Sequence, residues 1–484
     1  MFRAKKFFLM LLVLMGVGSA YCVAFGASEN HDKILSLEEY LQQVASGHKG
    51  VRAAKEASQG AWLRASEGSL SLYPALFASG YFRDDKRPTT STTIQGNETI
   101  SKNYSFGVSQ LTPFGLQAKL VYTLMQTDLF GINQTLVPTS NFFDASPQLE
   151  LTQSLWRNGF GRETRSQQEF SDAQASATSF AERFKTKLLL ADAESAYWRL
   201  TVARDIVNIQ RQSLERAQKI YDWTVKREHL QLGDKADRLQ AEAALKGREL
   251  ELKVALNEER AAIRTFNSLR GLESEELNEV LPFPHVDMIL TLAPVSKAQL
   301  RDDVQAAQEA KRATQANADM ALERNSPTLE LFSTLSLNGR DQQLSEAASQ
   351  SFMTGHPLYL VGVRFSTPLG LGALSDTREG YRKDRFAAEL NFERKLFEQE
   401  REWEDLSRQF LDAKESLKLT QQIEAAQKEK LGYERDRLSR GRTTTYQLLL
   451  FEQDYANAQV SRIRSQAAVL RILAQMKIFG GDES

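Results

Sequence analysis

The segment from Arg162 to Leu232 contains no glycine or proline, and no other feature of the sequence restricts the fold as strongly. At about 1.5 Å per residue, a continuous helix of this length would extend for about 100 Å, which is wider than a single globular core. Helices of this length occur in coiled coils, membrane spans and helical repeats. The segment is too highly charged to lie in a bilayer, so the sequence predicts a long rod in water.

An apolar stripe runs along much of this segment at alternating spacings of three and four residues. The stripe consists of Leu189, Ala193, Ala196, Leu200, Ala203, Val207, Leu214, Ala217 and Tyr221. Only Gln210 interrupts it. Such spacing averages about 3.5 residues and keeps one apolar face toward a partner helix, so we expect coiled-coil packing.

The first 26 residues have the features of a secretory signal peptide. Basic residues precede an apolar stretch over 7–18, and small residues then allow cleavage after Ala20 or Gly26. The bulky Tyr21 argues against lipidation at Cys22, the only cysteine. No further apolar run of 18 residues follows, so we expect an exported chain without a transmembrane helix.

Charge and motif content argue against nucleic-acid binding and catalysis. The 61 basic and 62 acidic residues give a formal net charge of −1, whereas nucleic-acid partners usually require a basic excess. The five histidines are His31, His48, His229, His285 and His356. None has a second ligand at metal-binding spacing, and no phosphate-binding loop or catalytic triad pattern occurs. We therefore expect no enzyme activity, no metal and no cofactor.

The chain repeats itself at a spacing of about 210 residues. Gly233 and Gly441 each interrupt a long helical pattern and lie 208 residues apart, while Pro147 and Pro357 each open an alternating segment and lie 210 apart. Similarity at a fixed spacing indicates tandem duplication. The predicted organisation is a signal peptide (1–26), a first repeat (27–271), a linker (272–296), a second repeat (297–480) and a short tail (481–484).

Segments with alternating apolar and polar residues predict β-strands. In 114–126, Leu116, Leu120 and Tyr122 share one face. Further candidates begin at Pro74 and at 103–112, 147–156, 327–338 and 357–368. Most are about 10–12 residues long, near what a tilted strand needs to cross a bilayer. The same alternation fits a soluble sheet packed on a helix, but strand length and the export signal favour the membrane.

The first repeat holds an insertion of about 43 residues between Tyr81 and Pro147. The insertion contains two candidate strands joined by a tight turn at 113–115. The first repeat therefore offers four candidate strands and the second offers two.

Tandem halves, membrane-length strands, helices of about 100 Å and an export signal together resemble the TolC family of outer-membrane efflux channels. The most specific segment, 431–453 (LGYERDRLSRGRTTTYQLLLFEQ), is similar to the helix–turn–helix at the family's periplasmic tip, with Gly441 at the turn. Its first-half counterpart, 232–242, is about two residues shorter after its glycine. Residues 194–200 (ESAYWRL) are similar to a sequence that is frequent in the first long helix of family members. The resemblance covers essentially the whole mature chain.

The resemblance implies a mixed α/β membrane protein in which a trimeric transmembrane β-barrel continues into a long periplasmic α-helical barrel. Independently, four to six strands cannot close a barrel, and open sheet edges are not tolerated in hydrocarbon, so strands must be pooled between chains. Three copies would give twelve strands if the inserted hairpin lies outside the wall, and eighteen if it joins the wall. Its clean alternation favours eighteen.

The implied function is a passive duct of a tripartite efflux or type I secretion system in the outer membrane of a Gram-negative-type bacterium. The implied partners are two further copies, a periplasmic adaptor (membrane fusion) protein, outer-membrane lipid and, indirectly, an inner-membrane pump. The alternative is a periplasmic coiled-coil adaptor or structural rod. Adaptors usually carry one helical hairpin without duplication, which favours the duct.

The resemblance also assigns roles to particular residues. Adaptor docking and gating are assigned to the helix tips, at Gly233, Asp234, Lys235, Asp237, Gly441, Arg442, Thr443 and Thr444. Gln447 and Leu450 occupy positions where family members can carry a cation-binding acidic ring, so we expect no such ring there. The polar strand faces are expected to line the lumen with Gln117, Lys119, Thr123, Gln148, Glu150 and Thr152. For the tips, ordinary helix capping is an alternative explanation of the same residues.

Overall fold

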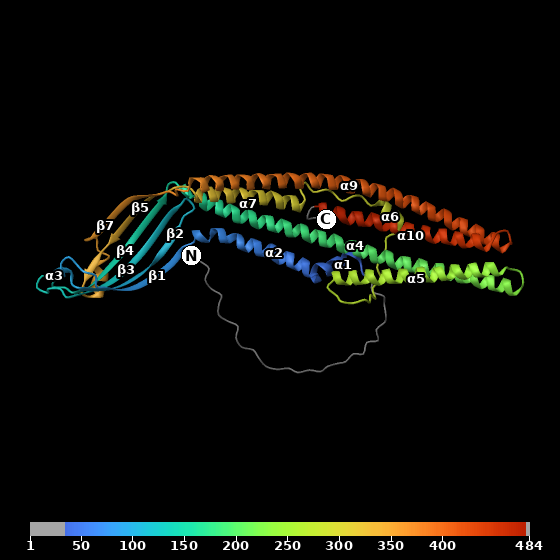
Figure 1. Cartoon of the computed structure of the whole chain (residues 1–484), viewed down its shortest axis with the longest axis horizontal. Coiled ribbons are helices and arrows are strands. Elements are labelled where there is room, and N and C mark those ends of the chain that lie inside the picture. The colour runs from blue at the N-terminus through green and yellow to red at the C-terminus, as the bar shows by residue number, and fades with distance from the viewer. Residues whose placement is uncertain (1–33, 481–484) are drawn as a thin grey trace, which may run out of the picture.

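The computed structural model describes residues 34–480, so the predicted signal peptide, Cys22, His31 and the tail (481–484) lie outside the described residues. A β-sheet forms one end of an elongated molecule, and long helices run away from it (Figure 1). The two longest helices are α4 (Arg162–His229) and α9 (Leu371–Ser439), with 68 and 69 residues. Within 34–480, no helix is long and apolar enough to cross a membrane.

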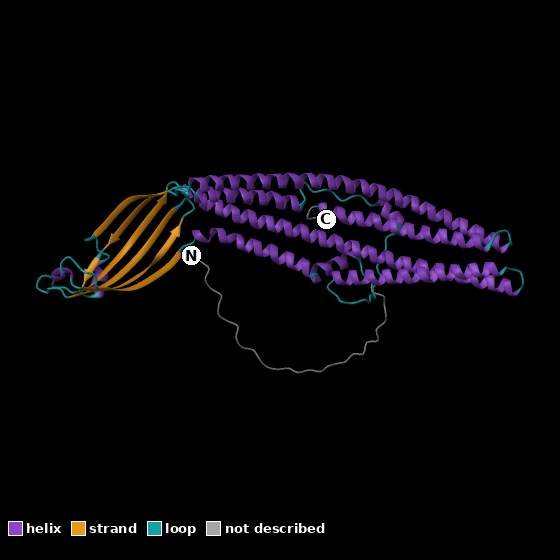
Figure 2. Cartoon of the chain, in the orientation of Figure 1, coloured by secondary structure: helices purple, strands orange, loops and turns teal. Residues whose placement is uncertain are grey.

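The helices form two long hairpins with shorter helices alongside (Figure 2). The helix α4 pairs with α5 (Lys235–Leu269), and α9 pairs with α10 (Thr445–Met476). The others are α1 (Leu37–Gly47), α2 (Lys49–Ala65), α3 (Thr92–Gln95), α6 (Val286–Thr291), α7 (Asp302–Arg324) and α8 (Leu344–Gln350). The helix α2 follows α4, and α7 lies between α4 and α9, so every long helix has a partner along its length.

The apolar stripe on α4 is largely buried, as its spacing predicts. Ala193, Leu200 and Val207 are buried between α4 and its neighbours, and the alanines allow the helices to approach closely. The stripe is densest around a three-ring cluster of Tyr40, Tyr197 and Phe266. The rings of Tyr40 and Phe266 stack with centroids 4.1 Å apart, and both side chains are fully buried.

Residues 272–296, predicted as a linker, pack into this same core. Val286 and Ile289 of α6 are buried against the helices. The Arg204 guanidinium donates hydrogen bonds to the carbonyls of Leu277, at 3.1 Å, and Glu279, at 2.5 Å. Residues 272–296 therefore pack against the long helices near the middle of the rod.

The sheet has one continuous antiparallel path of six long strands, in the order β1-β2-β3-β4-β5-β7. The strands are β1 (Ala75–Asp85), β2 (Glu98–Leu111), β3 (Leu116–Phe130), β4 (Asn141–Ser154), β5 (Thr328–Leu337), β6 (Gly339–Asp341) and β7 (Pro357–Ser366). The inserted hairpin β2–β3 lies inside this path, between β1 and β4. The hairpin therefore belongs to the sheet of the single chain, and its place in a barrel wall stays a prediction.

The strand β4 begins at Asn141, so the prediction that Pro147 opens this strand is wrong. Pairing of β4 with β5 stops at Gln148, and pairing with β6 resumes at Ala145 in the same register. Pro147 therefore occupies the gap between β5 and β6, where its missing N–H interrupts little of the ladder. The second half accordingly has β6 as a short continuation of β5, in addition to the two predicted strands.

Candidate functional site

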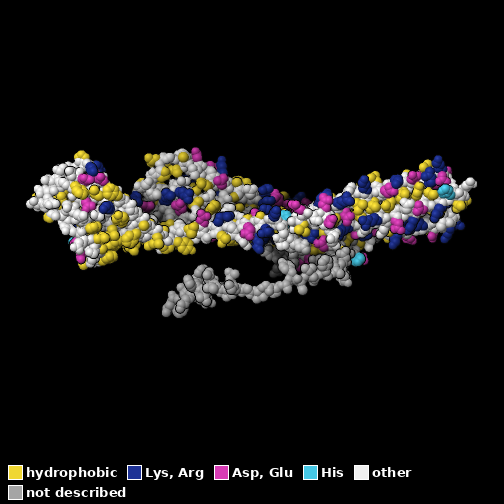
Figure 3. Space-filling view, turned by 90° about the horizontal axis from the view of Figure 1, so that it is seen from below, with side chains coloured by type: hydrophobic (Ala, Val, Ile, Leu, Met, Phe, Trp, Pro, Cys, Tyr) yellow, Lys and Arg dark blue, Asp and Glu magenta, His cyan; other side chains and the backbone are white. Residues whose placement is uncertain are grey.

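The two faces of the sheet differ sharply in polarity. The register places one apolar face across all six long strands, which we call the outer face. It includes Leu76, Phe106, Val108, Leu120, Tyr122, Leu124, Leu149, Leu151, Leu335, Val361 and Val363. Many of these side chains are exposed, with Leu120 at 57% and Val361 at 71%. Hydrophobic side chains gather over the sheet at the left of Figure 3.

All six residues predicted to line a lumen lie together on the opposite face. Gln117 lies opposite Thr152, and Lys119 lies opposite Glu150, on neighbouring strands β3 and β4. The Lys119 Nζ and Glu150 Oε2 atoms are 3.3 Å apart, so the two charges offset each other. The sheet thus presents a polar wall, Gln148 and Thr123 included, opposite an apolar one.

The eight residues assigned to the tips lie at the free ends of the two helical hairpins, far from the sheet (Figure 1). The Asp234 carboxylate caps α5 by accepting a hydrogen bond from the Ala236 backbone N–H at 3.3 Å. The Thr444 hydroxyl caps α10 by accepting from the Gln447 N–H, also at 3.3 Å. Helix capping is therefore sufficient to explain Asp234 and Thr444 at these positions, and docking of an adaptor remains a proposal.

The residue with left-handed backbone in the first turn is Gln231, so the pairing of Gly233 with Gly441 is wrong. Gln231 has φ of 59° and Gly441 has φ of 69°. In both turns the next residue donates its N–H to the carbonyl of an arginine, Arg227 or Arg437, at 2.9 Å. The matched positions then lie 210 residues apart, which is also the offset of the two strand prolines.

We expect opposite effects of glycine exchange in the two turns. A non-glycine residue in left-handed backbone costs about 1–2 kcal/mol, so Gln231→Gly should stabilise the first hairpin and Gly441→Ala should destabilise the second. Thermal unfolding followed by circular dichroism would measure both. Gly233→Ala is the control and should cost less than Gly441→Ala, since Gly233 does not have positive φ and its added Cβ atom would only press on the Arg227 side chain at 3.2 Å. A larger loss at Gly233 than at Gly441 would contradict this description of the turns.

Gln447 and Leu450 both lie on the exposed side of the first turns of α10. Neither carries a charge. The exposed aromatic ring of Tyr446 lies beside them in the sequence.

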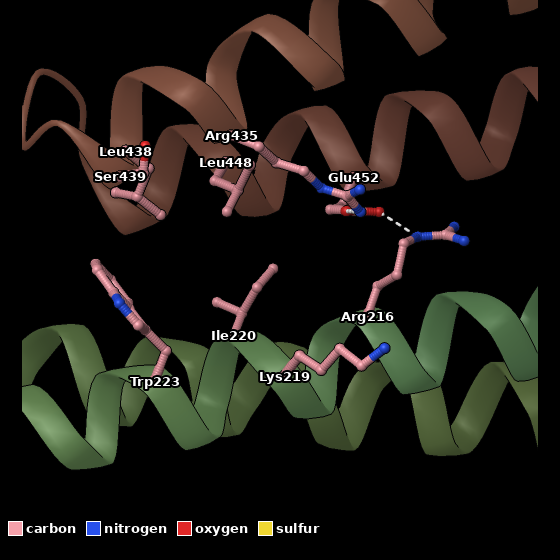
Figure 4. Close-up of a pocket in the computed structure, with 9 residues that line it drawn as sticks. All are labelled: Arg216, Lys219, Ile220, Trp223, Arg435, Leu438, Ser439, Leu448 and Glu452. Atoms are coloured by element: carbon pink, nitrogen blue, oxygen red, sulfur yellow. Dashed lines mark hydrogen bonds and ion pairs between the residues drawn. The ribbon is translucent and has the colours of Figure 1, made fainter.

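A buried carboxylate near the tips joins the two hairpins, and the sequence interpretation missed it. Glu452 of α10 is 4% exposed. Its Oε2 accepts a hydrogen bond from Arg216 Nε of α4 at 2.6 Å, and its Oε1 accepts one from Arg435 of α9. Figure 4 shows Glu452 between the hairpins, with the bond to Arg216 drawn across the space that separates them. These residues line a cavity of about 360 Å³, together with Lys219, Ile220, Trp223, Leu438, Ser439 and Leu448.

The position of Glu452 in the heptad pattern of α10 indicates that its carboxylate is buried. It lies four residues after Leu448 and four before Ala456, both buried, so a carboxylate stands where the pattern requires an apolar residue. The Arg216 guanidinium also lies 5.6 Å from the centre of the Tyr455 ring. Burial and the nearby Glu424 carboxylate raise the pKa of the Tyr455 phenol, which therefore stays neutral beside this network.

Among residues 34–480, no group of three or more His, Cys, Asp or Glu side chains is placed to hold a metal ion.

No protein-family model matches the sequence, and no curated protein sequence matches it. Solved structures do match. The outer-membrane channel OprN aligns with a TM-score of 0.66 at 19% identity, over 92% of this chain and 90% of its own. The outer-membrane protein VceC of Vibrio cholerae gives 0.65 at 14% identity, over 92% and 96%. The MtrE outer-membrane channel of Neisseria gonorrhoeae, in its open state, gives 0.63 at 16% identity, over 96% of each chain.

This chain has the outer-membrane channel fold. The alignments extend through both the sheet and the helical hairpins, because they cover more than nine-tenths of the chain. The resemblance to the TolC family is thereby confirmed at the level of the fold. In the channel fold, the polar sheet face and the hairpin tips lie at opposite ends of the molecule.

Proposed function

We propose that three copies of this chain form a duct through the outer membrane of a Gram-negative-type bacterium. The observation that carries the proposal is the exposed apolar outer face of the sheet. A soluble protein rarely exposes an apolar patch of this extent, and the chain's own long helices do not cover it. An apolar face of this kind is stable when it contacts the acyl chains of a bilayer.

The edges of the sheet explain why several copies are needed. In the described chain, β1 and β7 each pair with a strand on one side only. Unpaired edges are not tolerated in hydrocarbon, so β1 of one copy would pair with β7 of the next. With six long strands from each copy, a trimer closes with eighteen, and the polar wall then faces a water-filled lumen.

Exposed apolar side chains on the outer helices favour the same assembly. In α9, Phe386, Leu390 and Phe397 are exposed at spacings of four and seven residues. In α2, Trp62 and Leu63 are exposed. Such positions suit packing of α9 of one copy against α2 of its neighbour, which would close the helices into a second barrel below the sheet.

In this assembly the chain performs no chemistry. It would carry substrates passively across the periplasm and outer membrane, as part of a tripartite efflux or type I secretion system. The hairpin tips, with the eight residues named above, would dock a periplasmic adaptor, and an inner-membrane pump would act through that adaptor. The alternative of a periplasmic rod is tested by salt washing, because a rod would be released while a duct would stay in the outer-membrane pellet.

The bond between Arg216 and Glu452 would hold the two hairpins together in the closed duct. We expect Glu452→Gln to increase conductance in planar bilayers, because two guanidinium groups would lose their shared carboxylate. A hydrogen bond to a charged group contributes about 1.5–3 kcal/mol, which corresponds to a shift of roughly tenfold or more toward the open state.

Strong block by divalent cations from the periplasmic side would contradict the expected absence of an acidic ring at Gln447 and Leu450.

Glu215→Gln is the matched control for this measurement. Glu215 is the neighbour of Arg216 in the sequence, but its carboxylate is 66% exposed and pairs with Lys219 within α4. The same change in charge should therefore leave conductance unchanged. Equal effects of the two variants would contradict the gating role of Glu452, and absence of any conductance in all forms would contradict the duct itself.

A further inference from the structure

The loop between β6 and β7, residues 342–356, folds back onto the sheet. We call it the flap. Within it, α8 packs so closely on β6 that a Cβ atom at Gly339 would lie 2.2 Å from the Ala347 carbonyl oxygen. Ala347 and Ser351 are fully buried, and so is Ala145 of β4 beneath them. The flap is therefore a packed element of the fold.

The strand register identifies the face on which the flap lies. Leu124, Ala145 and Gly339 are aligned across β3, β4 and β6, so they share the outer face. Tyr122 lies two residues from Leu124 on the same face. Its hydroxyl is 3.2 Å from the Ser351 hydroxyl. The flap consequently covers part of the apolar outer face. At the gap between β5 and β6, its Gln350 and His356 also line a cavity with Thr123 and Gln148 of the polar wall.

Aromatic rings connect the flap to the outer face. The Phe352 ring stacks on Tyr122 with centroids 5.8 Å apart and planes 13° apart, and Tyr122 in turn contacts Phe106 at 5.4 Å. The flap also exposes apolar side chains of its own. Leu344 is 46% exposed, Phe352 67% and Met353 60%. The apolar surface thus continues from the strands onto the flap.

We propose that the flap is a lipid-contacting element of the outer leaflet, with Leu344, Phe352 and Met353 at the boundary between headgroups and acyl chains. This inference rests on the proposed function. Aromatic and apolar side chains next to an apolar strand band are typical of that boundary. A neighbouring copy is the less suitable occupant, because the flap lies over the middle strands β3 and β4, whereas copies would join at β1 and β7.

Site-directed spin labelling tests the position of the flap. Cys22 is the only cysteine in the sequence, so a Cys22→Ser background accepts single labels. The probe is Met353→Cys in the full chain, reconstituted in phospholipid vesicles. Leu120→Cys on the outer face and Thr123→Cys on the polar face are the references. Collision of the label with oxygen and with a water-soluble nickel chelate then reports depth.

We expect the Met353 label to collide with oxygen several-fold more, relative to the chelate, than the Thr123 label does, at a depth of about 5–10 Å. The Leu120 label should lie deeper. A Met353 label as accessible to the chelate as Thr123 would overturn the inference, as would strong spin–spin coupling between labels of neighbouring copies. A Leu120 label in water would instead overturn the proposed function.

Discussion

Leu120→Arg is expected to abolish stable insertion into the outer membrane. Leu120 is the fifth of the 15 residues of β3, lies on the outer face and is 57% exposed. An arginine on the lipid-facing side of a barrel costs up to about 2–4 kcal/mol, with the highest cost at the bilayer midplane, and a trimer would carry three. The measurement is the fraction of chain that remains in salt-washed outer membranes, together with the fraction that is folded in vesicles.

Thr123→Arg is the matched control on the same strand. Because successive residues alternate between faces, Thr123 lies on the polar wall, where it faces Ser105 at 3.3 Å between hydroxyl oxygens. We expect this arginine to be tolerated in water. The opposite ranking, with Thr123→Arg more damaging than Leu120→Arg, would show that the assigned faces are reversed.

Phe266→Ala is expected to cause the largest loss of stability in the helical rod. Phe266 is fully buried, stacks on Tyr40 and contacts the Tyr197 ring, where α1, α4 and α5 meet. Truncating a buried phenylalanine costs about 3–5 kcal/mol, because the cavity does not close completely. The measurement is unfolding in denaturant, followed by helical circular dichroism.

Leu250→Ala provides the control on the same helix. Leu250 is 63% exposed in the chain, so its truncation should change stability by less than about 0.5 kcal/mol. Comparable losses from both variants would mean that the ring cluster is not the centre of the rod's core.

Much of this fold was predictable because its two periodicities are strong. The heptad stripe on α4 and the alternation in 114–126 each keep one period over their whole length. The local sequence is therefore enough to predict a helix and a strand there. The inserted hairpin was predictable for the same reason. Its alternating residues match those of β1 and β4, and the structure places it between them.

The errors arose where tertiary context overrides a local signal. Pro147 ordinarily marks a strand end, but here it lies inside β4, opposite the break between β5 and β6. Gly233 ordinarily marks a helix end, but the left-handed position belongs to Gln231. Glu452 required knowledge of Arg216, which lies on another helix far away in the sequence.

In the proposed assembly, the six-stranded sheets of three copies close into a single tube. Cryo-electron microscopy of the purified protein in lipid nanodiscs would reveal the number of copies and of strands in the barrel. We expect a threefold assembly with an eighteen-stranded barrel, in which β1 of each copy pairs with β7 of the next and the hairpin β2–β3 lies in the wall. A monomer with both edges free, or a twelve-stranded barrel with that hairpin outside the wall, would contradict it.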